Sequence, residues 1–450
     1  NMETKKKGFP VAFWVCACSE IFERLAYYLG RSLILIFVTA SVATGGLGLS
    51  DTVAANMQSN LTAFSYLLPL FGAVIVDKYI GARYTTPVGM FIAAAGYFTG
   101  GIAKSATGVY VMIFLVSLGL ALFKNGAIIG RVITDKSQMD PAFSMRYTLV
   151  NVGAFIGTFL VGILYKDVFA KNGVLGFAPC FKMAALMMVL GGLWYIFVCW
   201  RFLGDLGKLP FKKTLTEEEK AAEAKKKEET GTKQPLTTIE KKRIGAIFVA
   251  SLFSIVFWIF WYLGYMPVYF YWAENMDWVV AGYQVPSTWF DAANSLFCVI
   301  LGPLTAALWK KLAARPQGDM SLFRKTGLGI AIIGVGYLFY AAIDIMRGGE
   351  KASVLWLIVF AFLLTMGEMF FSPLGHSFIS KYSPSRYLAV MMSVWGFATF
   401  IAAKSYGPVY GLLFGGKIEF KVACIGVAVV SFAAALIMIA LDKKLSALVD

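Results

Sequence analysis

Long apolar stretches, separated by short polar connections, follow one another along the whole chain. Each has roughly 20 residues or more, the length that a helix needs to cross a hydrocarbon core of about 30 Å. The pattern therefore predicts an all-α membrane protein. It predicts twelve membrane-spanning helices, at residues 11–42, 53–76, 83–103, 108–131, 144–166, 176–202, 244–273, 287–312, 325–346, 352–381, 386–416 and 420–441.

Composition and charge agree with this assignment. Of the 450 residues, 58% are hydrophobic and only 15% are charged, whereas a soluble globular chain carries about 25% charged residues. Lysine and arginine gather at both ends and in the connections after alternate spans, as at Lys78, Lys310 and Arg324. The positive-inside rule then places both termini in the cytoplasm of a multi-pass protein of the plasma membrane or bacterial inner membrane. The net charge of +15 follows from this topology, and we expect no nucleic-acid partner.

The largest polar stretch runs from Gly204 to Arg243 and includes "TLTEEEKAAEAKKKEETGTKQ". It is too polar to enter a membrane, and its mixed Glu and Lys run suits a solvated or partly helical linker. We therefore predict an N-terminal six-helix bundle at 1–202, a cytoplasmic linker at 203–243 and a C-terminal six-helix bundle at 244–450. Two bundles with a solute site near the bilayer midplane are typical of secondary transporters.

The first predicted span carries the polar stretch "SEIFERLAYYLGR". At about 100° per residue its polar side chains fall within an arc of about 140°, so they form one stripe. Each charge facing lipid would cost about 2.5 to 3.5 kcal/mol, so the stripe must face water or partners. The stripe consists of Glu20, Glu23, Arg24, Tyr27, Tyr28 and Arg31.

Two interpretations of this stripe remain. A buried ion-pair cluster, with Glu23 bound to Arg24, would only fix helix packing. Charges inside a membrane usually mark ion or substrate paths, however, and a carboxylate among arginines can hold or release a proton as its neighbours move. We therefore predict proton coupling at Glu20 and Glu23, with Arg24 as their partner.

The stripe also resembles a family motif. Glu20-Ile-Phe-Glu23-Arg24 matches the Glu-x-x-Glu-Arg motif of the proton-dependent oligopeptide transporter family, and the following Tyr27, Tyr28 and Arg31 keep that family's spacing. This family is part of the major facilitator superfamily. The resemblance implies the major facilitator fold, with twelve helices in two six-helix bundles.

The connection after the second span, "GAVIVDKYIGAR", resembles the superfamily signature Gly-x4-Asp-x3-Gly-x-Arg. Gly72 and Gly81 allow a tight turn and close helix contact, while Asp77 and Arg83 can pair or cap helix ends. The resemblance implies that Asp77 and Arg83 control a cytoplasmic gate. An ordinary glycine-rich turn is the alternative.

Further segments resemble the family's substrate pocket. The matching residues are Tyr66, Lys124, Asn151, Asn294, Glu368, Ser372 and Trp395; in "RYTLVNVGA", Arg146 stands in place of the family's Phe. The resemblance implies a zwitterionic peptide whose carboxylate suits Arg31 and Lys124 and whose amine suits Glu368. Amides such as Asn151 and Asn294 can bond the peptide backbone, and the Tyr and Trp side chains can form tolerant pocket walls.

One departure concerns the span at 244–273, which in the family commonly reads Phe-Trp-x-x-x-Glu-Gln. This chain has Tyr262 and Leu263 in place of the Glu-Gln pair, so an acid that could pair with Lys124 is absent from that span. Asp291, on the next span, is a possible replacement counter-charge. It is equally well interpreted as a solvated residue near the outer mouth.

The predicted function is proton-coupled symport, in which a monomer imports di- and tripeptides by alternating access. The proton is the coupling ion, and no cofactor or metal is expected. The departure at Tyr262 leaves an alternative with the same fold and proton coupling but a non-peptide solute, such as an amino-acid derivative, nitrate or a drug-like anion or zwitterion. We do not expect an enzyme, because the sequence has no Ser/His/Asp set, metal cluster or phosphate loop and only one histidine. A sensor that binds without transport is the remaining alternative.

Overall fold

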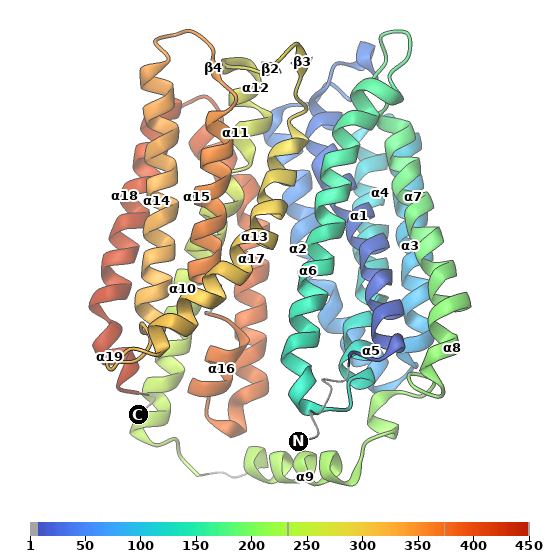
Figure 1. Cartoon of the computed structure of the whole chain (residues 1–450), viewed down its shortest axis with the longest axis vertical. Coiled ribbons are helices and arrows are strands. Elements are labelled where there is room, and N and C mark those ends of the chain that lie inside the picture. The colour runs from blue at the N-terminus through green and yellow to red at the C-terminus, as the bar shows by residue number, and fades with distance from the viewer. Residues whose placement is uncertain (1–7, 232–233, 373, 449–450) are drawn as a thin grey trace, which may run out of the picture. The chain divides into compact units, whose positions relative to one another are not determined.

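The computed structural model describes residues 8–231, 234–372 and 374–448, which are mostly helical (Figure 1). They fall into two compact units. The first unit contains the residues up to Leu47 together with Leu68–Leu215. The second unit contains Gly48–Leu67 and the residues from Thr216 onwards.

In the first unit, α1 packs against α6 and α7, and α3 packs against α4 and α7. Buried side chains that include Phe13, Ile128, Tyr195 and Phe211 form one hydrophobic cluster of this unit. The helices of this unit are α1 (Val11–Thr39), α3 (Ala82–Ile102), α4 (Ala106–Leu122), α5 (Asn125–Val132), α6 (Met139–Ile163), α7 (Phe177–Trp194) and α8 (Trp200–Leu203), with the end of α2 (Asp51–Lys78). Short helical turns are η1 (Val42–Thr44), η2 (Lys136–Gln138), η3 (Leu164–Val168), η4 (Tyr195–Cys199) and η5 (Phe211–Lys213).

In the second unit, α14 packs against α15 and α18, α10 against α17, and α13 against α15. Its helices are α9 (Glu217–Gly231), α10 (Thr238–Leu263), α11 (Met266–Tyr269), α12 (Tyr271–Asn275), α13 (Thr288–Ala313), α14 (Leu322–Met346), α15 (Trp356–Phe371), α16 (His376–Tyr382), η6 (Ser385–Tyr387), α17 (Leu388–Phe414), α18 (Phe420–Ala440) and α19 (Asp442–Ser446). Two short strands, β1 (Met276–Asp277) and β4 (Ala352–Ser353), pair in parallel. Strands β2 (Val279–Val280) and β3 (Tyr283–Gln284) pair antiparallel.

The start of α2 is bonded to α17 within the second unit. The Ser59 hydroxyl donates to the Ala403 carbonyl at 2.5 Å and accepts from the Gly407 amide at 3.3 Å. The Tyr406 hydroxyl donates to Gln58 Oε1 at 3.0 Å. These buried bonds explain why residues 48–67 pack with the second unit. The boundaries predicted from the sequence place this segment in the N-terminal bundle, and they stay a prediction.

Three of the predicted spans are interrupted. The span at 108–131 divides into α4 and α5 at Phe123 and Lys124, where the Lys124 amide donates to the Thr86 hydroxyl at 3.2 Å. The span at 244–273 divides after α10, and Pro267, which lacks an N–H group, lies in the first turn of α11. The span at 352–381 divides between α15 and α16; Pro373 lies outside the described residues. Two of these ranges, Ala106–Val132 and Thr238–Asn275, nevertheless remain long and apolar enough to cross a membrane as interrupted helices.

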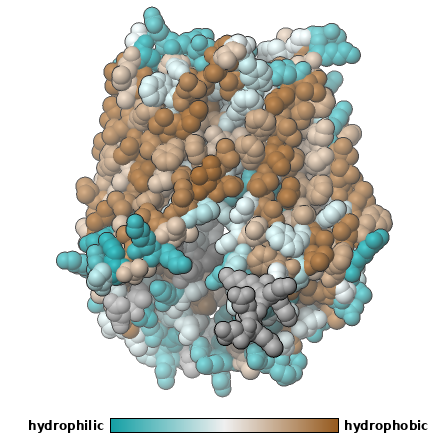
Figure 2. Space-filling model, viewed as in Figure 1, coloured by the Kyte–Doolittle hydropathy of each residue, from teal (hydrophilic) through white to brown (hydrophobic). Residues whose placement is uncertain are grey.

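The structure confirms a helical membrane fold of several spans. In the described part of the chain, nine helices are long and apolar enough to cross a membrane. On the face shown in Figure 2, hydrophobic side chains cover the sides of the helices and hydrophilic ones gather at their ends. The α15 helix is apolar but has 16 residues, a length of about 24 Å, and α1 carries the charged stripe. The count of twelve spans stays a prediction.

Two glycines bring α6 close to the backbone of α1. A Cβ atom added to Gly157 would lie 2.5 Å from the Leu25 carbonyl oxygen, and one added to Gly153 would lie 3.1 Å from that of Ile21. The Gly-x-x-x-Gly spacing puts both glycines on one face of a helix and permits close approach in membranes. This contact fixes how α1 presents its polar stripe to α6.

Substituting Gly157→Ala is expected to lower the free energy of unfolding by about 1 to 3 kcal/mol, because the methyl group must displace the α1 backbone. The matched control is Gly426→Ala in α18, where an added Cβ meets no atom within 4 Å. Alanine there should be neutral or stabilise the helix by up to about 1 kcal/mol. Thermal unfolding midpoints of the purified variants in detergent measure both changes. Equal midpoints for the two variants would contradict the packing argument.

Candidate functional site

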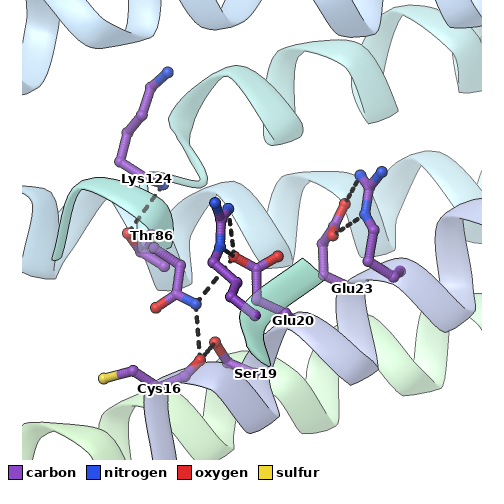
Figure 3. A network of polar contacts seen from close by, with 9 residues as sticks. Cys16, Ser19, Glu20, Glu23, Thr86 and Lys124 are labelled. Atoms are coloured by element: carbon purple, nitrogen blue, oxygen red, sulfur yellow. Dashed lines mark hydrogen bonds and ion pairs between the residues drawn. The ribbon is translucent and has the colours of Figure 1, made fainter. Parts of the chain in front are cut away.

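The polar stripe of α1 is largely buried within the first unit. Glu20, Glu23, Tyr27 and Arg31 are buried, while Arg24 is partly exposed. Figure 3 shows the Glu20 and Glu23 side chains projecting from neighbouring turns of α1. The prediction that one face of this helix gathers its charges away from lipid agrees with this burial.

Glu20 is bound by two other helices. Its Oε1 atom accepts from Nε of Arg146 on α6 at 2.9 Å and lies 2.8 Å from Nη2 of the same guanidinium. Asn125, the first residue of α5, donates from Nδ2 to the same oxygen at 3.3 Å and to the Cys16 carbonyl at 2.7 Å. The side chain of Glu20 is 3% exposed. This buried carboxylate therefore joins α1, α5 and α6.

Glu23 is bound by its neighbour in the sequence. Both of its carboxylate oxygens accept from the Arg24 guanidinium, through Nε and Nη2. The Arg24 guanidinium carbon also lies 4.5 Å from the centre of the Tyr27 ring and 5.5 Å from that of Tyr28. Such cation–π contacts stabilise an arginine without a carboxylate. Arg24 thus has both an ionic and an aromatic partner on its own helix.

Lys124 lies at the break between α4 and α5. Its ammonium donates to the Pro69 carbonyl on α2 at 2.6 Å, and in Figure 3 its side chain extends away from Glu20. Gly72 makes this contact possible, since a Cβ there would lie 1.7 Å from the Ala121 carbonyl and 2.9 Å from Lys124 Cε. A backbone carbonyl thus holds the ammonium group in this conformation.

Asn151 makes a local contact within α6. Its amide nitrogen donates to the Tyr147 carbonyl, one turn earlier, at 3.1 Å. This bond leaves the amide oxygen as an acceptor of further hydrogen bonds. The proposed contact of Asn151 with a peptide stays a prediction.

In the second unit, Asn294 on α13 and Glu368 on α15 each form a hydrogen bond to the other helix. Asn294 on α13 donates from Nδ2 to the Thr365 hydroxyl on α15 at 2.7 Å. One turn further along both helices, the Cys298 thiol donates to Glu368 Oε2 at 3.7 Å. Two neighbouring turns of α13 and α15 thus combine an amide, a hydroxyl, a thiol and a carboxylate. Sequence reasoning placed Asn294 and Glu368 in the site and missed Thr365 and Cys298.

The other predicted residues of the second unit have separate surroundings. Ser372 ends α15 and donates from its hydroxyl to the Met369 carbonyl at 3.3 Å. Trp395 is buried in α17, 7% exposed. Tyr66 accepts from the Tyr262 hydroxyl at 3.5 Å, and the Tyr262 ring stacks on Tyr406 with the ring centres 4.6 Å apart. The tyrosine at the position of the missing acid is therefore part of an aromatic cluster.

Asp291 is buried rather than solvated. It is 8% exposed, and its Oδ2 atom accepts a hydrogen bond from the Tyr269 hydroxyl. The interpretation as a solvated residue was therefore wrong. Lys124 belongs to the first unit and Asp291 to the second, so pairing between them stays a prediction.

Arg83, predicted for the cytoplasmic gate, caps the end of α8. Its Nη2 donates to the Gly204 carbonyl at 2.6 Å and its Nε to that of Leu206 at 3.2 Å. The guanidinium also lies 5.9 Å from the Trp200 ring centre. Asp77 and Arg83 were expected either to pair with each other or to cap helix ends. The described residues show Arg83 capping a helix end, and Asp77 is not among these contacts.

The turn that Arg83 caps is itself tightly built. Gly207 has a φ of +81°, and its carbonyl oxygen would lie 2.1 Å from a Cβ on Gly81, which confirms the close contact predicted for that glycine. Lys208 donates to Asp205 at 3.0 Å and holds the pKa of this exposed carboxyl below its ordinary value. The turn thus has little freedom to move away from α3.

Arg146 is the most consequential residue to which sequence reasoning assigned no role. The sequence shows it as an arginine in place of the family's Phe within an apolar span. That charge required a partner, so the signal was present. Asn125 gave no comparable signal, because its contact with Glu20 depends on the break between α4 and α5.

A family model described as the POT family matches residues 204–414. The chain is 24% identical over 451 residues to a di-/tripeptide transporter of Lactococcus lactis subsp. cremoris, covering 88% of each protein. It is 25% identical over 439 residues to the uncharacterized transporter YclF of Bacillus subtilis, covering 88% of this chain and 87% of that protein. These relatives are transporters, in agreement with the expectation that the chain is not an enzyme.

Solved structures show the same fold. A crystal structure of a POT family transporter in complex with 5-aminolevulinic acid superposes with a TM-score of 0.84, at 23% identity and 98% coverage of each chain. A crystal structure of the peptide transporter POT in complex with sulfate gives a TM-score of 0.86 at 22% identity, with 99% and 97% coverage. The helical arrangement is therefore that of these transporters.

Replacing Arg83 by Lys should loosen residues 204–213, because an ammonium group cannot reproduce the guanidinium fork. Leaving the capped carbonyls without donors should ease local opening of this segment by about 1 to 3 kcal/mol. Amide hydrogen exchange measured by mass spectrometry is expected to accelerate there. Arg201→Lys, at an exposed position of α8, is the matched control. Unchanged exchange in the Arg83→Lys variant would refute the capping role.

Proposed function

Because this chain belongs to the POT family, we propose that it is a proton-coupled symporter that imports di- and tripeptides by alternating access. Relatives named as di-/tripeptide or peptide transporters support the substrate class. The observation that carries the proposal is the pair of carboxylates, Glu20 and Glu23, buried among arginines on one membrane helix. If α1 only packed against other helices, buried ion pairs would add little stability compared with apolar side chains.

The coupling chemistry follows from burial. A buried carboxylate stays ionised while a guanidinium is bonded to it, and binds a proton once that partner leaves, since an unpaired buried charge is costly. Arg24 contacts the Tyr27 ring while its salt bridge to Glu23 is intact, so Glu23 would lose the salt bridge only if a rotamer change moved the guanidinium away from its carboxylate. A conformational change that moves Arg24 would therefore load or release a proton.

The binding chemistry follows from the charges of a zwitterionic peptide. Its carboxylate would bind Arg31 and Lys124, the latter exchanging the Pro69 carbonyl for an anion. Its amine would bind Glu368. The amides of Asn151 and Asn294 would bond the peptide backbone, and Ser372 would offer a further hydroxyl. Tyr27, Tyr28, Tyr66 and Trp395 would form walls for variable side chains.

We further propose that Asp77 and Arg83 belong to the cytoplasmic gate and that both termini are cytoplasmic, since lysine and arginine gather on that side. We expect a monomer in the plasma or bacterial inner membrane. The proton is the coupling ion, and we propose no cofactor.

A second candidate keeps the mechanism and changes the solute. Tyr262 occupies the position of the acid that the family commonly has, and its ring stacks on Tyr406. Tyr262 gives the site an uncharged aromatic ring where the family has a carboxylate. This favours a solute that does not need a second carboxylate of the protein, such as an amino-acid derivative. Competition by such compounds, without competition by peptides, would support this candidate.

Purified protein in liposomes is expected to accumulate labelled dialanine when an inward proton gradient is imposed, and dialanine blocked at both ends should compete poorly. Glu23→Gln should lose accumulation but retain counterflow, because a neutral amide cannot carry the proton yet leaves the substrate groups in place. Radiotracer uptake and counterflow measure the two activities.

The matched control for this variant is Glu419→Gln, which removes a carboxylate that is 72% exposed. It should behave as the wild type. Failure of the wild type to transport any member of a peptide panel would refute peptide transport, and full accumulation by Glu23→Gln would refute the coupling role of Glu23.

A further inference from the structure

Arg146 of α6 contacts residues of two other helices, α1 and α5. Its guanidinium meets Glu20 of α1 through two nitrogens, at 2.9 and 2.8 Å. It also lies against Gly126 of α5, where a Cβ would be only 2.8 to 3.1 Å from three guanidinium atoms. Any larger residue at position 126 would push the guanidinium from this place. Because Gly126 has no side chain, the Arg146 guanidinium has room to bind Glu20.

The position of Arg146 on α6 agrees with the packing of that helix. Arg146, Gly153 and Gly157 are spaced seven and then four residues apart, so they share one helix face. The two glycines contact the α1 backbone at Ile21 and Leu25. Glu20 and Arg146 are therefore held together by helices in close contact, all within the first unit.

The surroundings of Glu20 and Glu23 differ. Glu20 has two donors from other helices, Arg146 and Asn125. Glu23 is bonded to Arg24, which lies on the same helix and has the Tyr27 ring as a second partner. A rotamer change of Arg24 would free Glu23 from its guanidinium, whereas Glu20 would keep the Asn125 donor if Arg146 alone changed rotamer.

The charged and titratable groups near the two carboxylates come from several elements. Arg146 of α6 faces Glu20, and Lys124 precedes Asn125 at the start of α5. The phenol of Tyr97 on α3 lies within electrostatic range of Glu23. Further titratable groups near the preceding turn of α1 are Tyr195 and Cys199 of η4, and Cys16 of α1 itself. Arg146 is the cation bonded to Glu20.

We infer that Arg146 is a fixed counter-ion that keeps Glu20 ionised throughout the transport cycle, so that Glu23 alone exchanges the coupling proton. This inference rests on the proposed proton coupling and assigns its two carboxylates different roles. Arg146 is a positioning residue, because it acts on the coupling site through Glu20. The arginine in place of the family's Phe thus changes which carboxylate titrates.

Infrared spectroscopy of the purified protein in lipid tests the charge states without any substrate. Across roughly pH 5 to 8, one protonated-carboxyl band of the wild type should be missing from Glu23→Gln and present in Glu20→Gln. Bands from other buried carboxyls, such as Glu368, should be common to all variants. In Arg146→Gln a second band should appear, because an adjacent cation favours the charged carboxylate by about 1 to 3 pH units. That band should be absent from the double variant Glu20→Gln/Arg146→Gln. Arg146→Lys should lack this additional band.

A second pair of variants moves the guanidinium without changing any charge. Gly126→Ala should displace Arg146 and produce the same second band. Gly130→Ala, in the same helix, is the matched control, since a Cβ there meets only Phe143 at 3.5 Å, and it should match the wild type. This pair tests the inference even where Arg146→Gln fails to fold. A purely structural role for Arg146 would lower thermal stability in Gly126→Ala without adding a band.

Transport supplies the functional readout. Arg146→Gln should accumulate dialanine with a pH profile that has an added transition, whereas the control Gly130→Ala should keep the wild-type profile. A wild-type pH profile in Arg146→Gln, or loss of the Glu23 band in Glu20→Gln, would overturn the inference. If the wild type accumulates no solute on a proton gradient, proton coupling fails, while the infrared bands still decide whether Arg146 keeps Glu20 ionised.

Discussion

The burial of two carboxylates on one helix is the constraint on which the first unit depends. An ionised carboxylate removed from water needs a cation and further donors, or it must bind a proton. Glu20 obtains its cation from α6 and a donor from α5, and Glu23 obtains its cation from the next residue of α1. The requirements of one charge thus determine which residues α5 and α6 present to α1.

Glycines make these contacts geometrically possible. Gly153 and Gly157 bring α6 to the backbone of α1, Gly126 makes room for a guanidinium, and Gly72 lets Lys124 reach α2. In a membrane, apolar contact between helices gains little over contact with lipid, so close approach through small residues and polar bonds carries more of the specificity. The polar site and the glycine contacts are therefore two parts of one packing arrangement.

Much of the fold follows from sequence, because a long apolar run has few alternatives to a helix in a membrane. The break at Lys124 does not, since it depends on a tertiary partner, the Thr86 hydroxyl, which accepts the Lys124 amide. The stripe of α1 was predictable from helical periodicity. The partner of Glu20 was not, because Arg146 is 126 residues away and several arginines have comparable positions. For Asp291, sequence alone left solvation and burial equally plausible, and only the Tyr269 contact distinguishes them.

Two carboxylates one turn apart would titrate as a coupled pair if both exchanged protons, and each protonation would then depend on the state of the other. A cation bonded to one of them would weaken that coupling, because the Glu20 and Arg146 charges partly compensate each other. The position of Arg24 would then have the larger effect on Glu23. A carrier gains from this separation, since the proton is bound or released by one side-chain movement instead of by the average of two sites. On the proposed role of Arg146, Arg24 is the cation whose movement would control Glu23.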